Sequence, residues 1–338
     1  MKLGVTLPYA EGEMTRAQMV EFVQAADRLG YDTVWVPEAW TYDAFMLLAS
    51  VAELTVNIKL GTSIVNVYSR TPALIGQSTA TLDMLSEGRT VLGIGASGPQ
   101  VIEGWHGMPY QKPLQRTRET IDIVRMILRR DRLNYEGDVF QLRMGLKLIN
   151  HPLRPDVPIY VASLGPRNVA MTAELADGWI PVLFSPTRWR EVFGDALDEG
   201  LAKRSADLPP LQITPSVSIG ITDAPQAAAT IARFGLALYI GGMGSREHNF
   251  YNEVARRYGY VEEAAEIQDL FLGGDKGAAA ERVTDAMVDE FSVIGPEGLV
   301  KEKLAAYKES GASALLVNII AMSQRQRLEA LEKIISLV

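Results

Sequence analysis

The stretch of residues 59–99 constrains the fold more than any other part of this 338-residue chain. It begins with an apolar strand pattern, and the polar segment 63–70 that follows is too long for a simple turn. Pro72 suits the first turn of the helix that comes next, and residues 90–94 form a second, wholly apolar strand pattern that opens into glycines at 95–98. A strand, a helix and a second strand in this order predict one βαβ unit of a parallel sheet.

The same alternation of strand and helix patterns runs along the whole chain. The expected strands are 3–7, 33–36, 58–61, 90–94, 158–162, 177–181, 211–221 and 313–318. The expected helices are 15–29, 43–54, 72–88, 116–130, 168–176, 189–201, 296–310 and 324–337. The pattern breaks in an irregular excursion at about 133–157 and in a long, mostly helical insertion at about 225–291. A single domain over residues 1–338 is therefore predicted to be a (β/α)8 TIM barrel with these insertion segments, and an open doubly wound sheet is the alternative.

The composition limits the classes of partner and site. Hydrophobic residues make up 47% of the chain and charged residues 22%, which suits one large globular core. The net charge of -8 argues against nucleic-acid or membrane-surface binding, because both need a concentrated basic field, and no apolar run approaches the roughly 20 residues of a membrane-spanning helix. The absence of cysteine excludes disulfides and thiolate metal sites and agrees with a cytoplasmic location. The three histidines, at 106, 151 and 248, lack the spacing of paired metal ligands, so no metal site is expected.

Residues 93–98 read GIGASG, which matches the G-x-G-x-x-G pattern of dinucleotide-binding loops. That fingerprint needs a helix beginning at the third glycine, whereas segment 99–109 contains two prolines and two further glycines. We therefore predict a different role, in which the missing side chains let the backbone approach a flat ligand closely. Ligands in parallel α/β folds bind at the carboxyl ends of the strands, so loops 63–70 and 95–99 should open on the same face.

Nine short motifs are spread over nearly the whole chain: GTSIVN at 61–66, TPA at 71–73, ATLD at 80–83, SEGR at 86–89, LGIG at 92–95, EGWHG at 103–107, LGPRNV at 164–169, ADGW at 176–179 and GSRE at 244–247. Together they resemble the bacterial luciferase-like superfamily, and within it the oxidoreductases that use the deazaflavin coenzyme F420. Flavin-using members share most of these motifs, so FMN is the alternative cofactor. Relatives of this kind commonly form homodimers through barrel helices, which makes a homodimer the expected assembly.

The resemblance also implies which residues contact the cofactor. Ser63 and Ile64 would be joined by a cis peptide bond whose bulge lies behind the central ring of the deazaflavin. Backbone and side-chain hydrogen bonds to the cofactor would come from Asn66, Gly95, Ala96, Ser97 and Gly98. A helix start would place amides around the phosphate, as helix amino termini do for anions, and this segment comprises Ser163, Leu164, Gly165, Pro166 and Arg167. An ordinary helix entry is the alternative there, and the side chains that could screen the anionic tail are Arg70, Lys112 and Arg167.

Glu38 follows the second predicted strand, where similar proteins carry an acid followed by histidine, but the next residue here is Ala39. Oxidation of a hexose phosphate with that histidine as proton acceptor is therefore not expected. Glu38 is a candidate catalytic acid or base, or else a structural acceptor for backbone amides. Trp40 and Trp105 either wall the substrate pocket or belong to the rim of the barrel. His106 follows the glycine loop and is either a proton donor or a residue outside the pocket.

The sequence thus predicts an enzyme, an F420-dependent oxidoreductase that moves a hydride between the C5 carbon of the deazaflavin and a small organic substrate. The protein's share would be to hold the reacting carbon against the substrate and to keep water out. A luciferase-like monooxygenase that uses FMN is the first alternative. A non-catalytic binder of flavin or deazaflavin is the second, and the alanine in place of the histidine at position 39 favours it mildly.

Overall fold

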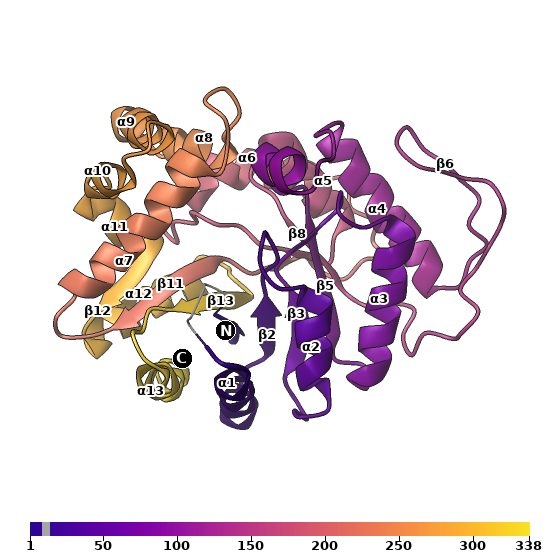
Figure 1. Ribbon diagram of the computed structural model, residues 1–338, viewed down its shortest axis with the longest axis horizontal. Coiled ribbons are helices and arrows are strands. Elements are labelled where there is room, and N and C mark those ends of the chain that lie inside the picture. Colours follow the sequence, from indigo (N-terminus) through magenta and orange to yellow (C-terminus); the bar gives the residue numbers. More distant parts are fainter. Residues whose placement is uncertain (9–13) are drawn as a thin grey trace.

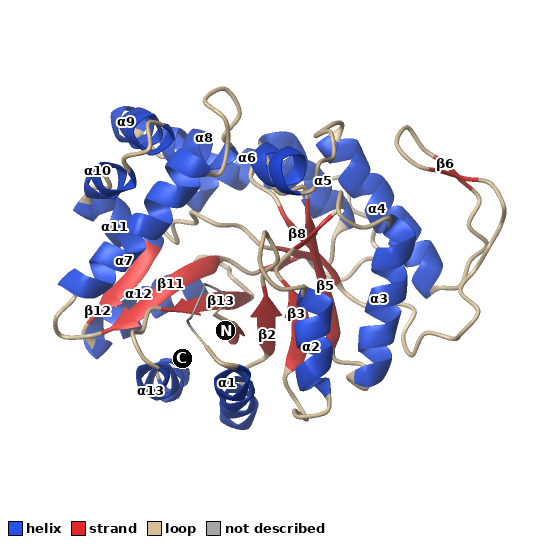
Figure 2. Cartoon of the chain, in the orientation of Figure 1, coloured by secondary structure: helices blue, strands red, loops and turns tan. Residues whose placement is uncertain are grey.

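The computed structural model describes residues 1–8 and 14–338. At its centre lies a curled sheet of parallel strands, surrounded by helices (Figures 1 and 2). The neighbouring strands follow one another in the order β10, β9, β8, β5, β3, β2, β1, β13, β11, β12. Their bounds are β1 Lys2–Thr6, β2 Thr33–Val36, β3 Lys59–Thr62, β5 Thr90–Gly95, β8 Ile159–Ala162, β9 Gly178–Trp179, β10 Gln212–Ile213, β11 Ser216–Ile221, β12 Ser292–Gly295 and β13 Ala314–Ile319.

The sheet closes because β10 and β11 are two halves of one barrel strand. β10 pairs with β9, and β11 pairs with β13 on the other side. The two residues between them still bond to the ring, since Thr214 N donates to Trp179 O and Leu316 N donates to Pro215 O. The predicted strand 211–221 is thus one bent strand, and all eight predicted strands are present. The closed ring confirms the TIM barrel and excludes the open doubly wound sheet.

The helices begin close to where the sequence places them, because side chains cap them. Thr15, Asp43 and Thr71 each accept a backbone N–H of the first turn, and Gly30 ends the first helix with a φ of 86°. Such caps satisfy amides that have no partner within the helix. The bounds are α1 Arg16–Leu29, α2 Ala44–Ala52, α3 Pro72–Leu85, α4 Pro113–Leu128, α5 Pro166–Leu175, α6 Trp189–Leu201, α7 Gln226–Ala237, α8 Phe250–Arg257, α9 Val261–Leu272, α10 Lys276–Glu281, α11 Asp285–Phe291, α12 Glu297–Glu309 and α13 Gln324–Ser336.

Six short elements were not predicted, namely four strands and two π-helices. Strand β12 lies beside β11 outside the closed ring. A two-residue strand, β4 (Val65–Asn66), lies inside the loop after β3 and pairs with β5. The excursion carries a short hairpin of β6 (Tyr135–Glu136) and β7 (Gln141–Leu142), and it projects away from the barrel (Figure 1). Two π-helices, η1 (Gln100–Trp105) and η2 (Leu238–Gly242), also flank the barrel mouth.

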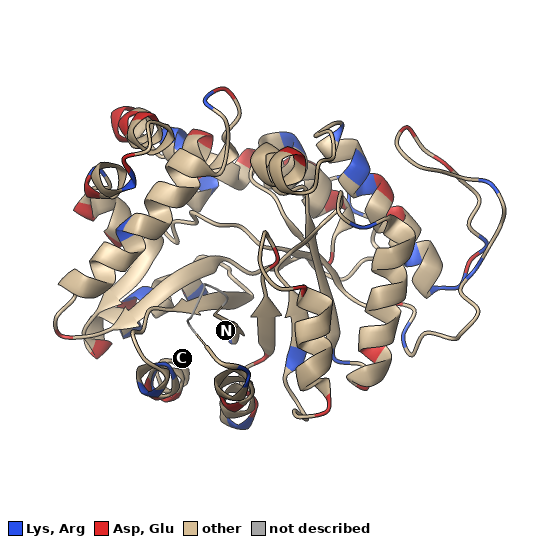
Figure 3. Ribbon diagram, in the orientation of Figure 1, with Lys and Arg blue, Asp and Glu red and all other residues tan. Residues whose placement is uncertain are grey.

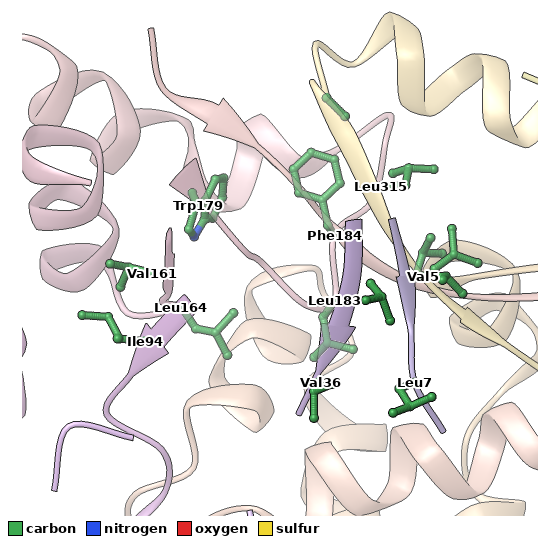
Figure 4. Packing of buried hydrophobic residues seen from close by; sticks show 14 of the residues in the cluster. Val5, Leu7, Val36, Ile94, Val161, Leu164, Trp179, Leu183, Phe184 and Leu315 are labelled. Atoms are coloured by element: carbon green, nitrogen blue, oxygen red, sulfur yellow. The ribbon is translucent and has the colours of Figure 1, made fainter. Parts of the chain in front are cut away.

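Side chains inside the ring form a floor for the site above them. Trp35, Val91, Ile180 and Leu316 come from four different parts of the barrel and pack together, with Ile64, Tyr160 and Ala162 against them. The glycines at positions 4 and 61 leave room for the Trp35 indole, because a Cβ there would lie 2.5 and 2.4 Å from its atoms. A larger cluster fills the space between strands and helices, and Figure 4 shows part of it around Trp179 and Phe184. Most charged residues lie on the outer helices and the excursion, and few lie on the strands (Figure 3).

Glu119 of α4 ties the excursion to the barrel. Its fully buried carboxylate accepts hydrogen bonds from the backbone N–H groups of Asp138, Val139 and Phe140 and from the side chain of Gln115. Burial alone would raise the pKa of Glu119, but these four donors outweigh it and hold the pKa below its ordinary value of 4.5.

We expect Glu119→Gln to lower the free energy of unfolding at neutral pH by roughly 1–3 kcal/mol, because one acceptor oxygen becomes a donor beside buried N–H groups. Since folding depresses the pKa of Glu119, its stabilising contribution is complete above about pH 4.5 and disappears as the pH falls through the folded-state value. Urea unfolding at a series of pH values measures both effects. The difference between wild type and variant should shrink on acidification, and a constant difference would contradict this role.

Candidate functional site

A cavity of about 850 Å³ lies at the carboxyl ends of the barrel strands. Its walls come from the segments 37–42 after β2, 63–64 after β3, 95–98 after β5, 162–165 after β8 and 180–182 after β9, with η2 and the start of α8 on the remaining side. The volume lies within the range of roughly 300–1,000 Å³ that small-molecule sites occupy. The loops after β3 and β5 therefore open on one face, as the sequence predicts, and they meet the loop after β8 there.

The floor of the cavity is built where β3 and β5 come closest. The peptide bond between Ser63 and Ile64 is cis, which confirms the predicted conformation, and both residues line the cavity. Thr62 Oγ1 accepts from Gly93 N at 2.8 Å and donates to Gly93 O at 2.7 Å. Position 93 admits only glycine, because a Cβ would lie 1.9 Å from the carbonyl oxygen of Thr62. At Gly95 a Cβ would lie 3.3 Å from the Ile64 side chain, so the glycine and the bulge together leave an open surface.

Asn66 and His106 do not line this cavity. For Asn66 this differs from the predicted direct contact with the cofactor, whereas for His106 it agrees with the alternative of a residue outside the pocket. Asn66 is fully buried, and its Oδ1 accepts from the backbone N–H groups of Tyr68 at 3.0 Å and Ser69 at 2.7 Å. Its Nδ2 lies 3.2 Å from Nε2 of His106. The amide group is thus occupied in shaping the loop after β3, and it connects that loop to the segment that follows η1.

We expect Asn66→Ala to leave the N–H groups of Tyr68 and Ser69 without an acceptor and to lower the free energy of unfolding by roughly 1–3 kcal/mol. Asn66→Asp keeps the acceptor, loses the donor to His106 and adds a charge that the two N–H groups partly offset, so it should cost less. Thermal and urea unfolding measure the difference. Equal losses in the two variants would show that the link to His106, rather than the loop turn, carries the contribution.

Glu38 lines the cavity, but its carboxylate has partners on the protein side. Arg70 forms an ion pair with it, with the second guanidinium nitrogen 2.9 Å from Oε2, and the backbone N–H of Ala44 donates to the same oxygen at 2.9 Å. Only 8% of the Glu38 side chain and 11% of the Arg70 side chain are exposed. Burial alone would lower the pKa of Arg70, but the carboxylates of Glu38 and Asp43 outweigh it and raise that pKa. These contacts favour the structural alternative for Glu38 over the catalytic acid or base.

The segment predicted to surround a phosphate lies partly on the cavity wall. Ser163, Leu164 and Gly165 line the cavity, whereas Pro166 and Arg167 are exposed and do not. Gly165 is the last residue before α5. The first turn of that helix has N–H groups without a partner within the helix, except at Pro166, which has no N–H. The hydroxyl of Ser163 is paired with that of Thr172 at 2.8 Å.

The three basic side chains considered for an anionic tail do not line the cavity. Arg70 is held by Glu38 and Asp43, Lys112 donates to Asp138 O, and Arg167 is exposed. Ala96, Ser97 and Gly98 do line the cavity, as the sequence predicted for the glycine loop.

Several aromatic residues of the cavity wall were not predicted. Tyr110 stacks on Tyr68 with ring centroids 5.3 Å apart, and its hydroxyl donates to Ser97 O at 3.2 Å. Burial raises the pKa of Tyr110 further above its ordinary value of 10. Further aromatic wall residues are Tyr42, Tyr239, Phe250 and Tyr251. Trp40 and Trp105, which were predicted as possible walls, also line the cavity and are 50% and 64% exposed.

Within residues 1–8 and 14–338, no cluster of three or more histidine, cysteine, aspartate or glutamate side chains could hold a metal ion. None of the helices in that same part of the chain is long and apolar enough to cross a membrane.

Comparison with known proteins gives consistent relatives in sequence and structure. The model of the luciferase-like monooxygenase family matches residues 1–314. A protein of Mycobacterium tuberculosis that is named as a coenzyme F420-dependent oxidoreductase is 40% identical, over 98% of this chain and 99% of its own length. The solved structure of the coenzyme F420-dependent tetrahydromethanopterin reductase from Methanopyrus kandleri has a TM-score of 0.83 at 23% identity, over 100% of this chain and 98% of that chain. An F420-dependent secondary alcohol dehydrogenase, solved with an F420-acetone adduct, has a TM-score of 0.79 at 17% identity, over 100% of this chain and 99% of that chain. At these identities the two solved structures establish the fold.

Proposed function

Because the chain belongs to the luciferase-like monooxygenase family, we propose that it is an F420-dependent oxidoreductase that transfers a hydride between the deazaflavin and a small organic substrate. The observation that carries this proposal is the meeting of three loops at one cavity: the cis bulge after β3, the glycine loop after β5 and the start of α5 after β8. The 40% identical relative, which matches over almost the full length of both chains, carries F420 in its name and supports the choice of cofactor.

The residues present fit a flat, phosphate-bearing heterocycle. Gly95 adds no side chain beside Ile64 on the floor, and a Cβ at position 95 would lie 3.3 Å from the Ile64 side chain. Gly98 is similarly restricted, since a Cβ there would lie 2.9 Å from the carbonyl oxygen of Met243. The cavity of about 850 Å³ has room for both a ring system and a substrate.

When bound, the deazaflavin supplies or accepts the hydride at its C5 carbon. The chain's own residues then bind the deazaflavin, orient the substrate against it and exclude water. We propose that Ile64 supports one face of the ring, that the backbone of 95–98 hydrogen-bonds its edge, and that the first free N–H groups of α5 bind the phosphate. Glu38 and Arg70 hold the loop after β2 in place, so Trp40 is positioned at the substrate side of the cavity.

Two turnover assays test this proposal against the monooxygenase alternative. With reduced F420, a panel of small carbonyl compounds should give substrate-dependent formation of oxidised deazaflavin, monitored by its absorbance. With reduced FMN and the same panel, oxygen consumption should not exceed the background rate of free reduced FMN. Oxygen consumption coupled to an oxygenated product would instead assign the cavity to the FMN-dependent reaction.

The same assays address the non-catalytic alternative, which the alanine at position 39 motivates. Turnover that Trp40→Ala abolishes while F420 affinity stays intact would reject a mere binder. Tight F420 binding with no turnover over a broad panel of carbonyl and alcohol substrates would favour it.

We further propose that the protein is a homodimer in the cytoplasm. The resemblance implies a dimer through barrel helices, and the excursion offers a different apolar surface for it. The excursion projects from the barrel, and its apolar side chains Met144, Leu146, Ile149 and Leu153 are exposed, Ile149 to 92%. Exposed apolar clusters of this kind mark interaction surfaces in many proteins. Light scattering after gel filtration should give twice the mass of the chain. The Ile149→Asp variant should shift the measured mass towards that of a single chain. A single-chain mass for the wild type would refute the dimer.

A further inference from the structure

Among residues 1–8 and 14–338, no basic side chain lines the cavity and Glu38 is the one charged residue that does. Arg70 and the N–H of Ala44 already engage its carboxylate. A carboxylate or phosphate on the substrate side would therefore find no cation, and it would also lie near Glu38. Burying an unpaired charge is costly, so this side of the cavity suits an uncharged molecule.

A second, smaller pocket of about 190 Å³ adjoins the cavity between the two π-helices. Trp40, Trp105 and Met243 line both spaces, so the two indoles stand where one opens into the other. The rest of its wall is Val101, the backbone of Gly104 and Gly242, and Gln100 as the one polar side chain that is not aromatic. We call this space the side pocket.

The side pocket has the size and surface of a site for an apolar ring. The side pocket is partly open to solvent, since Trp40 and Trp105 in its wall are 50% and 64% exposed, but its volume is comparable to the roughly 150 Å³ of an apolar cavity that binds benzene in another protein. The wall of Trp40, Trp105, Val101 and Met243 offers aromatic and aliphatic contact but no charge. A Cβ added at position 104 would meet no atom within 4 Å, so this part of the wall borders open space.

From these two observations we infer the substrate class: an uncharged organic molecule that places an apolar, ring-sized group in the side pocket between Trp40 and Trp105. This inference rests on the proposed function for its account of the main cavity, where the reacting part of the molecule would lie. The substrate would be recognised by burial of its apolar surface and by stacking on the two indoles. Charged molecules would be excluded, because their charge would find no partner in the cavity.

Calorimetric titration with 2-naphthol and 2-naphthoate tests the inference, because the two compounds have nearly the same size and differ in charge at pH 7. Titration of F420 alone is carried out first and reports separately on the proposed function. The naphthalenes are then added to the F420-saturated protein, or to the protein alone if F420 does not bind. We expect 2-naphthol to bind at least roughly tenfold more tightly than 2-naphthoate.

Gly104→Leu tests where the binding occurs, because position 104 lines the side pocket and an added Cβ would meet no atom within 4 Å. The variant should weaken the binding of 2-naphthol roughly ten- to a hundredfold and leave F420 affinity unchanged. Trp105→Ala removes one wall of the side pocket and should also weaken the binding of 2-naphthol. This second variant keeps the test valid if Gly104→Leu does not fold. Gly298→Leu is the matched control, an exposed helical glycine of α12 with no atom within 4 Å of an added Cβ, and it should bind like wild type.

Preference for 2-naphthoate, or 2-naphthol affinity that neither Gly104→Leu nor Trp105→Ala reduces, would overturn the inference. Both results leave the F420 titration standing, so a failed side pocket and a failed cofactor assignment are distinguishable.

Discussion

Arg70→Met is expected to lower the free energy of unfolding by roughly 3–5 kcal/mol, because it leaves the buried carboxylate of Glu38 without its counter-ion. The guanidinium also pairs with Asp43, which caps α2, so the loop after β2 and the start of that helix lose a common anchor. Since Glu38 and Trp40 both lie on the cavity wall, F420 turnover should fall together with stability. Urea unfolding gives the free energy, and the coupled turnover assay gives the second effect.

Two controls separate loss of the pair from loss of any arginine. Arg190 pairs with Asp198 at the surface, where both side chains are more than half exposed, so Arg190→Met should change stability by only about 0–1 kcal/mol. Adding Glu38→Gln to Arg70→Met removes the stranded charge and should restore part of the loss, since glutamine can still accept from the N–H of Ala44. A double variant less stable than Arg70→Met would show that Glu38 is not the residue left unpaired.

Gly95→Val is expected to weaken F420 binding by roughly a hundredfold while the barrel still folds. A Cβ at position 95 would lie 3.3 Å from the Ile64 side chain, a tight contact that a small shift relieves, but the valine branches would stand where the ring is proposed to lie. Shape mismatches of even one methylene change binding by roughly 10–200-fold. Fluorescence titration of F420 measures the affinity, and circular dichroism with thermal unfolding checks the fold.

Gly298→Val is the matched control for this variant, because the same side chain is added where no atom lies within 4 Å of the new Cβ. It should leave F420 affinity unchanged. If Gly95→Val bound F420 as tightly as wild type, the deazaflavin ring could not rest on the glycine loop, and the proposed arrangement of the cavity would be wrong.

The barrel could be predicted from the sequence because its signals are local. Pro72 after Thr71, and Gly30 after an amphipathic segment, mark helix ends through backbone conformation and capping alone. Strands buried on both faces read as apolar runs, as at Thr90–Gly95. The strand at Ser292–Gly295 escaped prediction because it directly follows α11, so no turn separates it from the helix.

The site was predictable only in part, because its contacts join residues far apart in the sequence. Nothing in the residue types signals a cis bond between Ser63 and Ile64, and that prediction came from resemblance to a family rather than from physical chemistry. The pairing of Glu38 with Arg70 spans 32 positions, so the sequence left the carboxylate free for catalysis. Asn66 illustrates the same limit, since its amide fits a ligand contact or a turn equally well until the positions of Tyr68 and Ser69 are known.

The wall formed by η2 and α8 shows where sequence reasoning gave no guidance. Tyr239, Phe250 and Tyr251 belong to the helical insertion, and helical periodicity does not reveal which turn of an insertion folds back over the barrel mouth. Tyr110 is a further case, because its contact with Ser97 depends on the unpredicted π-helix η1 between them.

The most direct test of the account is an equilibrium fluorescence titration of the purified protein with F420 and, in parallel, with FMN. The three loops that meet at the cavity predict saturable binding of F420 to one site per chain, with FMN weaker. Tight binding of FMN with no binding of F420 would contradict the central claim.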